Sequence, residues 1–257
     1  MISIVMRHIA SVVFATSFAF TCWMPLCRAQ SGPQYSLAPD LLIADPVHYK
    51  LELENQWARV IHEHMPPHEG VKMHTHPDPG GVVVSLTYQN LRQTQADGSV
   101  RVLTDGKPGR VSWATGRTHR GDNLMDTDYD YIEVEPKVQK EPQPASSAPT
   151  LTDYPDPAVS DTGRYHVEFE NDLVRVIRVR IAPLDHVAMH RHPAHGAVLI
   201  LLTDQDARQT FPDGTTHENH YKAHTVRWEA PGSGPHADQN LSDKPLEIIR
   251  VELKQSR

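Results

Sequence analysis

The stretch MHTHPDPGGVVVSLTYQNLRQTQADGS (73–99) returns as MHRHPAHGAVLILLTDQDARQTFPDGT (189–215), 116 residues further along the chain. The likeness extends upstream: aligning 49–99 with 165–215 needs no gap, and 23 of the 51 positions are identical. An internal repeat of this length sets the architecture, because both copies must fold into the same unit. We therefore predict two copies of one module, each carrying a His-x-His pair.

The repeat also sets the predicted domain boundaries in this chain of 257 residues. We place the first module at 46–136 and the second at 163–254. The segment 137–162 between them is rich in Pro, Ser and Ala, a composition that is typical of a semi-extended linker.

Each module shows the sequence pattern of strands. Polar and apolar residues alternate in 49–54 and 165–170, and short apolar runs rich in β-branched residues follow later in each copy. Asp97-Gly98 and Asp213-Gly214 are strong hairpin signals. No stretch after residue 29 keeps a helical period over three turns. About eight strands in roughly 90 residues predict an all-β chain made of two small antiparallel barrels or jelly rolls.

The N-terminal segment 1–29 has the pattern of a secretory signal peptide. A short basic start precedes an almost wholly apolar run, and small residues stand near a predicted cleavage site at Ala29–Gln30. Both cysteines, Cys22 and Cys27, lie inside this segment, so the mature chain would contain no disulfide and no thiolate. We expect a periplasmic or secreted protein; an uncleaved membrane anchor is the alternative.

The charge balance narrows the expected partners. The formal net charge is −7, and the chain has no run of five or more Lys and Arg residues. An acidic surface disfavours binding to nucleic acid and to anionic membranes. We expect a small-molecule ligand, no nucleic acid, and no membrane contact after cleavage. Association into a homo-oligomer stays open.

Histidines recur at matched positions in the two copies. In a strand, residues i and i+2 face the same side, so each His-x-His pair can direct two imidazoles at one point. A third histidine follows late in each module, four residues before an asparagine. A lone histidine is more often structural, but these three persist in both copies while the surrounding identity falls away after residue 99. The predicted metal ligands are His74, His76 and His119 in the first copy and His190, His192 and His236 in the second.

These motifs resemble those of the cupin superfamily, and the doubled arrangement resembles a bicupin. The second cupin motif ends in G-x2-H-x3-N, which Gly116, His119 and Asn123 match closely. In the second copy, Ser233 stands at the position of the glycine. The resemblance covers both modules. It implies two tandem cupin (jelly-roll) β-barrels, with one divalent metal ion held by each set of three histidines.

The first cupin motif is matched only in part. It has the form G-x5-H-x-H, then three or four residues before a ligating Glu. His68 and Leu184 stand where its leading glycine belongs. The Glu should fall near 80–81 or 196–197, where the chain has Gly-Gly and Gly-Ala. Three interpretations remain open: a site of three histidines alone, loss of metal binding, or substitution of the Glu by another residue. The candidates for substitution are Asp78, Gln93, His195 and Gln209.

An intact set of histidines without the Glu is what the resemblance associates with iron-dependent thiol, gentisate and β-diketone dioxygenases. Fe(II) is therefore the first metal to consider, with Mn, Ni, Cu or Zn as alternatives. The leading hypothesis is an exported metal-dependent dioxygenase acting on a small organic molecule. The alternatives are a non-catalytic protein that binds metal or small molecules, and a metal-assisted isomerase or lyase. The extra imidazole of His195 favours the second copy as the better metal site.

Overall fold

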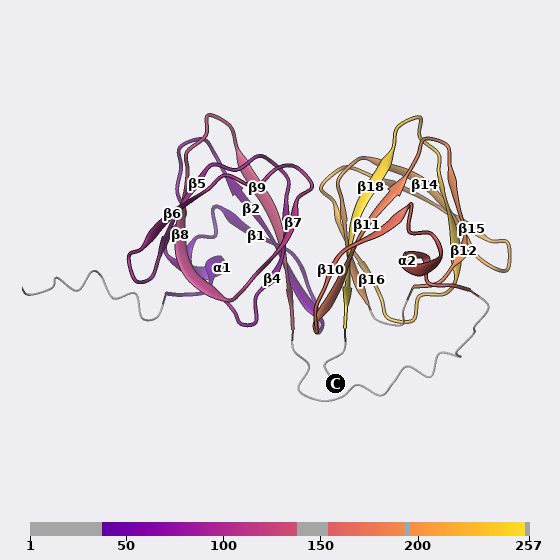
Figure 1. Cartoon of the computed structure of the whole chain (residues 1–257), viewed down its shortest axis with the longest axis horizontal. Helices are drawn as coiled ribbons and strands as arrows, with labels where there is room; N and C mark the ends of the chain where they lie inside the picture. The colour runs from indigo at the N-terminus through magenta and orange to yellow at the C-terminus, as the bar shows by residue number, and fades with distance from the viewer. Residues whose placement is uncertain (1–37, 138–153, 193–195, 255–257) are drawn as a thin grey trace, which may run out of the picture. The chain divides into compact units, whose positions relative to one another are not determined.

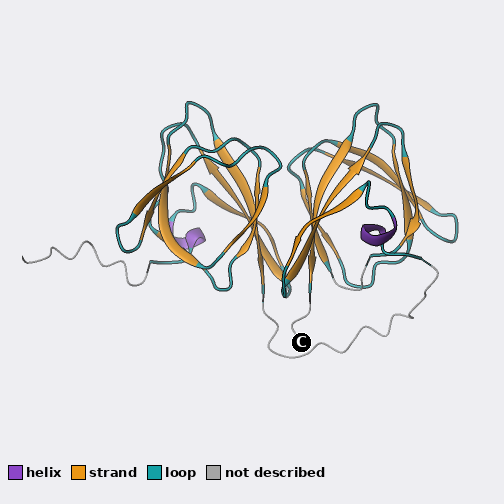
Figure 2. Ribbon diagram, in the orientation of Figure 1, coloured by secondary structure: helices purple, strands orange, loops and turns teal. Residues whose placement is uncertain are grey.

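The computed structural model describes residues 38–137, 154–192 and 196–254. Strands dominate this part of the chain, and its two halves repeat the same set of antiparallel sheets (Figures 1 and 2). The all-β prediction is confirmed. The predicted signal peptide and most of the predicted linker lie outside the described residues and stay predictions. None of the described helices is long and apolar enough to cross a membrane.

The N-terminal barrel consists of one helical turn and nine strands. They are α1 (Leu41–Ala44), β1 (Tyr49–Glu54), β2 (Ala58–Met65), β3 (His74–His76), β4 (Gly81–Ser85), β5 (Leu91–Gln95), β6 (Val100–Leu103), β7 (Val111–Ala114), β8 (Arg117–Asn123) and β9 (Tyr129–Pro136). Five strands form one sheet in the order β1-β2-β9-β4-β7, and four form a second in the order β3-β8-β5-β6.

The C-terminal barrel repeats this plan. Its elements are α2 (Pro157–Ser160), β10 (Tyr165–Glu170), β11 (Val174–Ile181), β12 (His186–His190), β13 (Ala197–Leu201), β14 (Gln205–Thr210), β15 (Thr216–Tyr221), β16 (Val226–Glu229), β17 (His236–Asn240) and β18 (Leu246–Leu253). The sheet orders are β10-β11-β18-β13-β16 and β12-β17-β14-β15. Two facing antiparallel sheets in each half are the arrangement of a jelly roll.

The strand register of the four-stranded sheets brings the predicted ligands together. His74 on β3 lies directly opposite His119 on β8, and His190 on β12 lies opposite His236 on β17. Because side chains alternate across a strand, these four imidazoles point to the same face as the remaining histidine of each pair. All of them turn toward the barrel interior and are almost completely buried.

Apolar residues close each barrel around its histidines. Leu41 of α1 belongs to the interior cluster of the N-terminal barrel with Ile61 and Met65, and Ala158 of α2 belongs to the corresponding C-terminal cluster. The largest buried cluster contains Val, Ile and Leu side chains of both five-stranded sheets. Burying one such side chain contributes roughly 1.5–3 kcal/mol, so the sheets supply a stable frame without any disulfide in the described residues.

The repeated asparagines have a structural role. The amide nitrogen of Asn123 donates to three backbone carbonyls, and its oxygen accepts from Met125 N–H. Asn240 makes the same four hydrogen bonds in the second barrel. Replacing a buried side chain that satisfies so many backbone groups costs several hydrogen bonds at once. The persistence of these asparagines through the duplication is therefore explained by the fold rather than by metal binding.

His68 and Leu184, which replace the leading glycine of the first cupin motif, keep its backbone conformation. Their φ angles are 60° and 59°, in the left-handed region that glycine occupies without steric cost. Both residues therefore carry local backbone strain, each in the corresponding turn of its own barrel.

We expect Leu184→Gly to raise the free energy of unfolding by about 0.5–1 kcal/mol, because glycine relieves the left-handed strain. The Leu184 side chain is 65% exposed, so little packing is lost. Chemical denaturation measures the change. Leu184→Ala, which shortens the side chain but keeps the Cβ, is the control and should give no increase; an equal increase in both variants would contradict the explanation.

Candidate metal centres

The structure assembles the first histidine triad inside the N-terminal barrel. The ligand atoms of His74, His76 and His119 all lie within 4.8 Å of one another, and the Nε2 atoms of His74 and His76 are 3.0 Å apart. Tyr49 places its hydroxyl 3.2 Å from His74 Nε2. The three imidazoles that the sequence predicted as ligands therefore converge on one point.

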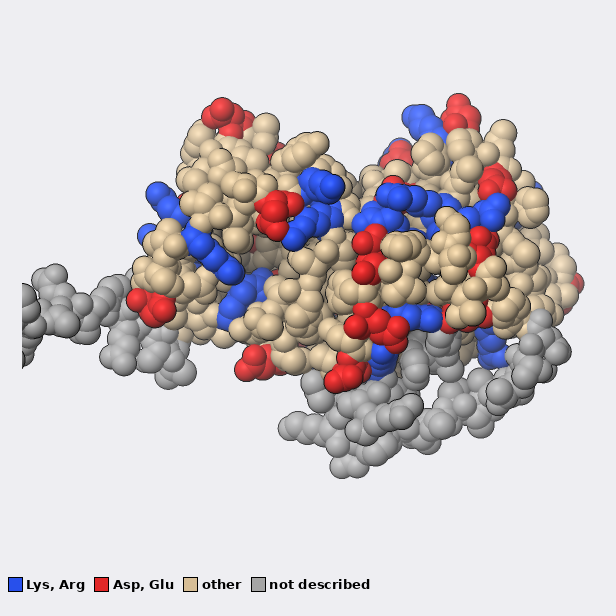
Figure 3. Space-filling view, viewed as in Figure 1, with Lys and Arg blue, Asp and Glu red and all other residues tan. Residues whose placement is uncertain are grey.

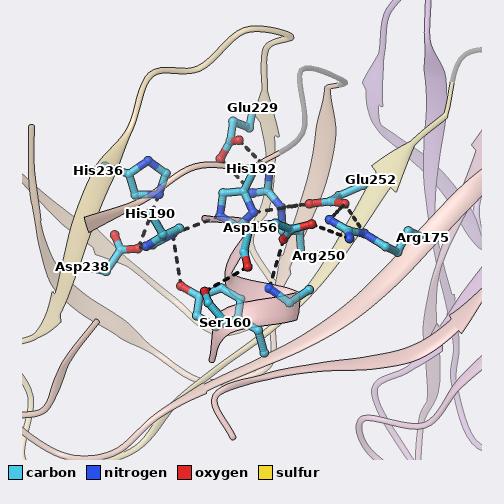
Figure 4. Close-up of polar contacts among 12 residues, drawn as sticks. Asp156, Ser160, Arg175, His190, His192, Glu229, His236, Asp238, Arg250 and Glu252 are labelled. Atoms are coloured by element: carbon cyan, nitrogen blue, oxygen red, sulfur yellow. Dashed lines mark hydrogen bonds and ion pairs between the residues drawn. The ribbon is translucent and has the colours of Figure 1, made fainter. Parts of the chain in front are cut away.

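The second triad has the same form. His190, His192 and His236 converge within 4.8 Å, and the Nε2 atoms of His190 and His192 are 3.3 Å apart. Figure 4 shows the three rings turned toward one another, with Asp238 beside His190. Tyr165 occupies the position of Tyr49, its hydroxyl 3.4 Å from His190 Nε2. Each tyrosine was missed as a site residue, although its identity at the 116-residue offset was a signal.

In the C-terminal barrel, backbone carbonyls accept from the outer nitrogens of two imidazoles, whereas His192 Nδ1 makes no hydrogen bond within the described residues. His190 Nδ1 lies 2.9 Å from the Ala188 carbonyl, and His236 Nδ1 lies 3.2 Å from the Gly234 carbonyl. His192 Nδ1 is 3.4 Å from the Glu252 carboxylate. A carbonyl oxygen cannot donate, so Nδ1 of His190 and of His236 carries the ring proton, and the Nε2 atoms of these two neutral rings keep their lone pairs. The donor set is thus prepared for a metal ion.

In the N-terminal barrel, one imidazole is held differently. The Gln93 amide nitrogen donates to His119 Nδ1 at 3.0 Å. The orientation of this amide is determined by Arg101, whose Nε donates to Gln93 Oε1 at 2.8 Å and has no lone pair to accept with. His119 Nδ1 is therefore an acceptor, and the neutral ring carries its proton on Nε2, pointing into the triad. The first triad is less suited to metal than the second.

The remaining two imidazoles of the first triad have acceptor partners. His74 Nδ1 donates to the Lys72 carbonyl at 2.7 Å, and His76 Nδ1 lies 3.1 Å from Glu133. Burial and the neighbouring His76 lower the pKa of His74 to about 4. Burial also lowers the pKa of His76, but the Glu133 carboxylate outweighs it and raises the pKa overall. For His119, burial and the charges of His74 and Arg117 push the pKa far down.

The structure explains why neither copy has the expected Glu. A Cβ added to Gly80 would lie 1.9 Å from the Ala114 carbonyl, and one on Gly196 would lie 2.3 Å from the Trp228 ring. At Gly81, the side chain of Glu133 from the neighbouring strand β9 fills the space a larger residue would need. Glycine is required at these positions, because neighbouring backbone carbonyls and side chains occupy the volume.

A buried ion pair is inverted between the two barrels. In the first, Glu133 on β9 accepts from both terminal nitrogens of Arg117, at 3.2 and 3.0 Å. At the corresponding position on β18 the second barrel has Arg250, which donates to Glu229 at 2.9 and 2.7 Å. Burial raises the pKa of each carboxyl, but the adjacent cations outweigh it and lower both values to about 2. The buried charge at this matched position is therefore a carboxylate on β9 and a guanidinium on β18.

That inversion has opposite effects on corresponding imidazoles. The pKa of His76 is raised by Glu133, whereas burial and Arg250 lower the pKa of His192 well below its ordinary value. His192 is thereby kept neutral, the state in which an imidazole binds a metal. Glu63, a second buried carboxyl of the first barrel, has its pKa raised to about 7 by burial.

Each triad opens into a cavity of about 360 Å³. The C-terminal cavity is lined by His192, His236, Asp238, Arg227 and Trp228, among others. Arg227 stacks on the Tyr221 ring at 4.2 Å, and no carboxylate of the described residues lies within ion-pair distance of it. On the face of the molecule shown in Figure 3, basic and acidic side chains are interspersed.

The four residues considered as replacements for the missing Glu differ in where the structure places them. Gln93 and Gln209 face inward, to His119 Nδ1 and to Asp238 respectively. Asp78 is exposed and packs against Gly116, away from the triad. His195 lies outside the described residues, so its predicted contribution stays a prediction.

Comparison with known proteins supports the fold. No protein-family model and no curated protein matches the chain in sequence. Among solved structures, AerE from Microcystis aeruginosa has a TM-score of 0.55 at 12% identity, covering 81% of this chain and 94% of its own. An oxalate decarboxylase from Lactobacillus farciminis has a TM-score of 0.50 at 14% identity, with 79% and 78% covered.

These identities show a likeness of fold alone. The described residues form two tandem antiparallel jelly-roll barrels, each with three buried histidines at its centre. The chain therefore has the bicupin fold, as the sequence motifs predicted, and each histidine group has a geometry that can hold a metal ion.

Asp45 connects α1 to the first triad. Its carboxylate accepts from Lys72 N–H at 3.1 Å, and the carbonyl of Lys72 in turn orients His74. The same carboxylate lies 3.0 Å from His48 Nδ1. Burial opposes charging of both groups, but their mutual attraction lowers the pKa of Asp45 and raises that of His48.

We expect this pair to stabilise the fold most at mildly acidic pH. The contribution of a histidine with a raised pKa is complete below about 6.5 and is lost as the pH rises through its folded-state value. The contribution of an aspartate with a lowered pKa is lost as the pH falls below about 3.9. Denaturation of the metal-free protein should show the stability gap between wild type and His48→Gln shrinking from pH 6 to pH 8. A gap that stays constant over this range would contradict the charge pairing.

Proposed function

We propose that this protein is a metal-dependent enzyme whose active centre is the second triad, His190, His192 and His236. The observation that carries the proposal is that the three imidazoles converge within 4.8 Å beside a cavity, while backbone carbonyls accept from Nδ1 of His190 and His236 and leave their Nε2 atoms available to a metal. Three neutral nitrogen donors suit a divalent transition metal, and Fe(II) is the ion that we propose.

The donor set fits such an ion on geometric grounds. Nitrogen ligands about 2.1 Å from one ion stand roughly 3.0–3.4 Å apart in octahedral or tetrahedral arrangements. The His190 and His192 Nε2 atoms are 3.3 Å apart. Ferrous iron at this point would supply the redox chemistry by which dioxygen reacts with organic molecules. The proposed reaction class is therefore a dioxygenase reaction.

The surrounding residues indicate an acidic substrate. Arg227 lacks a carboxylate partner among the described residues, so it can pair with a carboxylate of the substrate. The buried oxygens Asn219 Oδ1 and Gln205 Oε1 also line this cavity without a hydrogen-bond partner in the described part of the chain. They can accept from hydroxyl groups of the substrate, and Tyr165 can donate a hydrogen bond at the floor of the site. We propose a small hydroxylated or enolic organic acid as the substrate.

The proposed enzyme acts after export. Residues 1–29 have the signal-peptide pattern, and we propose the periplasm or the exterior of the cell as its location. A protein that takes up its metal after export would not meet the metal pool of the cytoplasm. Metal analysis should therefore use protein isolated from its native compartment.

We expect one metal ion per chain, because His119 directs a proton at the first triad. Elemental analysis of the exported protein measures the ratio. His192→Ala should reduce bound metal to a trace, whereas the matched variant His76→Ala should keep it. Two ions per chain, or equal losses in both variants, would contradict the assignment to the second barrel.

We expect the iron-loaded protein to consume dioxygen when given an enolic or catecholic acid, as measured with an oxygen electrode. Arg227→Gln should raise KM for the acid at least about tenfold, since it removes a charge-assisted contact. Bound iron without oxygen uptake across the panel would overturn the dioxygenase proposal. Turnover without oxygen would instead identify an isomerase or lyase, and no turnover of any kind a binding protein.

A further inference from the structure

Asp238 is a carboxylate that the second barrel has and the first lacks. It lies on β17 two residues after His236, so both side chains point to the same face of the strand. The corresponding position on β8, two residues after His119, is Gly121. Sequence motifs did not single out Asp238, because the cupin motif has its glutamate elsewhere.

The carboxylate stands close to two of the three histidines of the triad. Asp238 Oδ2 lies 3.5 Å from His236 Nε2 and 3.8 Å from His190 Nε2. Two adjacent ligand atoms on one ion are separated by about 3.0–3.4 Å, so Oδ2 lies within a few tenths of an ångström of that separation from His236 and His190. Figure 4 shows Asp238 on the side of His190 and His236, away from Glu252.

A neighbouring side chain orients this carboxylate. Gln209 is paired with Asp238 across β14 and β17, and its Nε2 donates to Asp238 Oδ1 at 3.4 Å. That contact uses the oxygen remote from the histidines and leaves Oδ2 free to bind. The Asp238 side chain is 23% exposed, so it reaches the cavity as well as the triad.

We propose that Asp238 is the fourth protein ligand of the metal in the C-terminal barrel and replaces the glutamate missing from the first motif. The inference rests on the proposed function, because it needs a metal at the second triad. It makes that centre one of three histidines and one carboxylate. When the metal is bound, the carboxylate would offset part of the charge of the ion. The first barrel, with Gly121, has no such ligand.

The test uses the full exported chain stripped of metal and titrated with Co(II) alone. The dissociation constant and the visible absorption of bound Co(II) are compared among wild type, Asp238→Asn and Asp206→Asn. Asp206 is an exposed aspartate of the same barrel that pairs with His220, so its variant controls for loss of one charge. Circular dichroism and thermal unfolding of the metal-free proteins establish that each variant is folded.

We expect Asp238→Asn to weaken Co(II) binding by at least about tenfold and to change the absorption spectrum, since a coordinating oxygen is lost. Asp206→Asn should match wild type in both. Binding and spectrum unchanged in Asp238→Asn, while His192→Ala abolishes binding, would overturn the role of Asp238 and leave the three-histidine centre standing. Absence of Co(II) binding in the wild type would overturn the proposed function and this inference together.

Discussion

The proposed metal centre depends on the pairing of each imidazole Nδ1 with a group outside the triad. The direction of that hydrogen bond decides which ring nitrogen keeps its lone pair, and therefore whether the triad can bind a cation. In the second barrel, the carbonyls of Ala188 and Gly234 hold the protons of His190 and His236 on their outer nitrogens. In the first barrel, Gln93 donates to His119 instead. Two triads with the same residues thus differ in what they can bind.

The sheets fix the positions of the histidines and of the groups that face their Nδ1 atoms. The opposed positions of His190 and His236 follow from the register of β12 and β17, and the register follows from apolar faces that must stay buried. Tight packing around the triads also determines what else fits. Trp228 occupies the space above Gly196, and Glu133 occupies the space above Gly81.

The two copies have diverged in their charges while keeping their geometry. Glu133 on β9 pairs with Arg117 of β8, whereas Arg250 at the corresponding position of β18 pairs with Glu229 of β16. A change of this kind keeps the pair neutral, so the fold tolerates it, yet it reverses the sign of the charge at this position of the central strand. Gly121 against Asp238 is a second difference of the same sort. Duplication followed by separate specialisation of the two cavities explains the pattern.

The fold and the six histidines of the candidate sites could be predicted from the sequence. The repeat at an offset of 116, alternating strands and paired histidines predicted two all-β barrels with six converging imidazoles, because strand periodicity and register follow from local pattern and burial. The asparagines were also visible, but their hydrogen bonds to the backbone were not. Tyr49 and Tyr165 were visible as identities, and the sequence offered no reason to place their hydroxyls beside a histidine.

Tertiary structure alone decided the partners of each ring. Whether Gln93 donates or accepts depends on Arg101, which lies on the adjacent strand. Whether a carboxylate stands beside a triad depends on strands far apart in the sequence, as Glu133 beside His76 shows. The sequence by itself determined which residues recur and which faces of the strands they share. The proton positions, the charges nearest the triads and the placement of Asp238 were decided by contacts across the sheets, since no local pattern encodes which strands become neighbours.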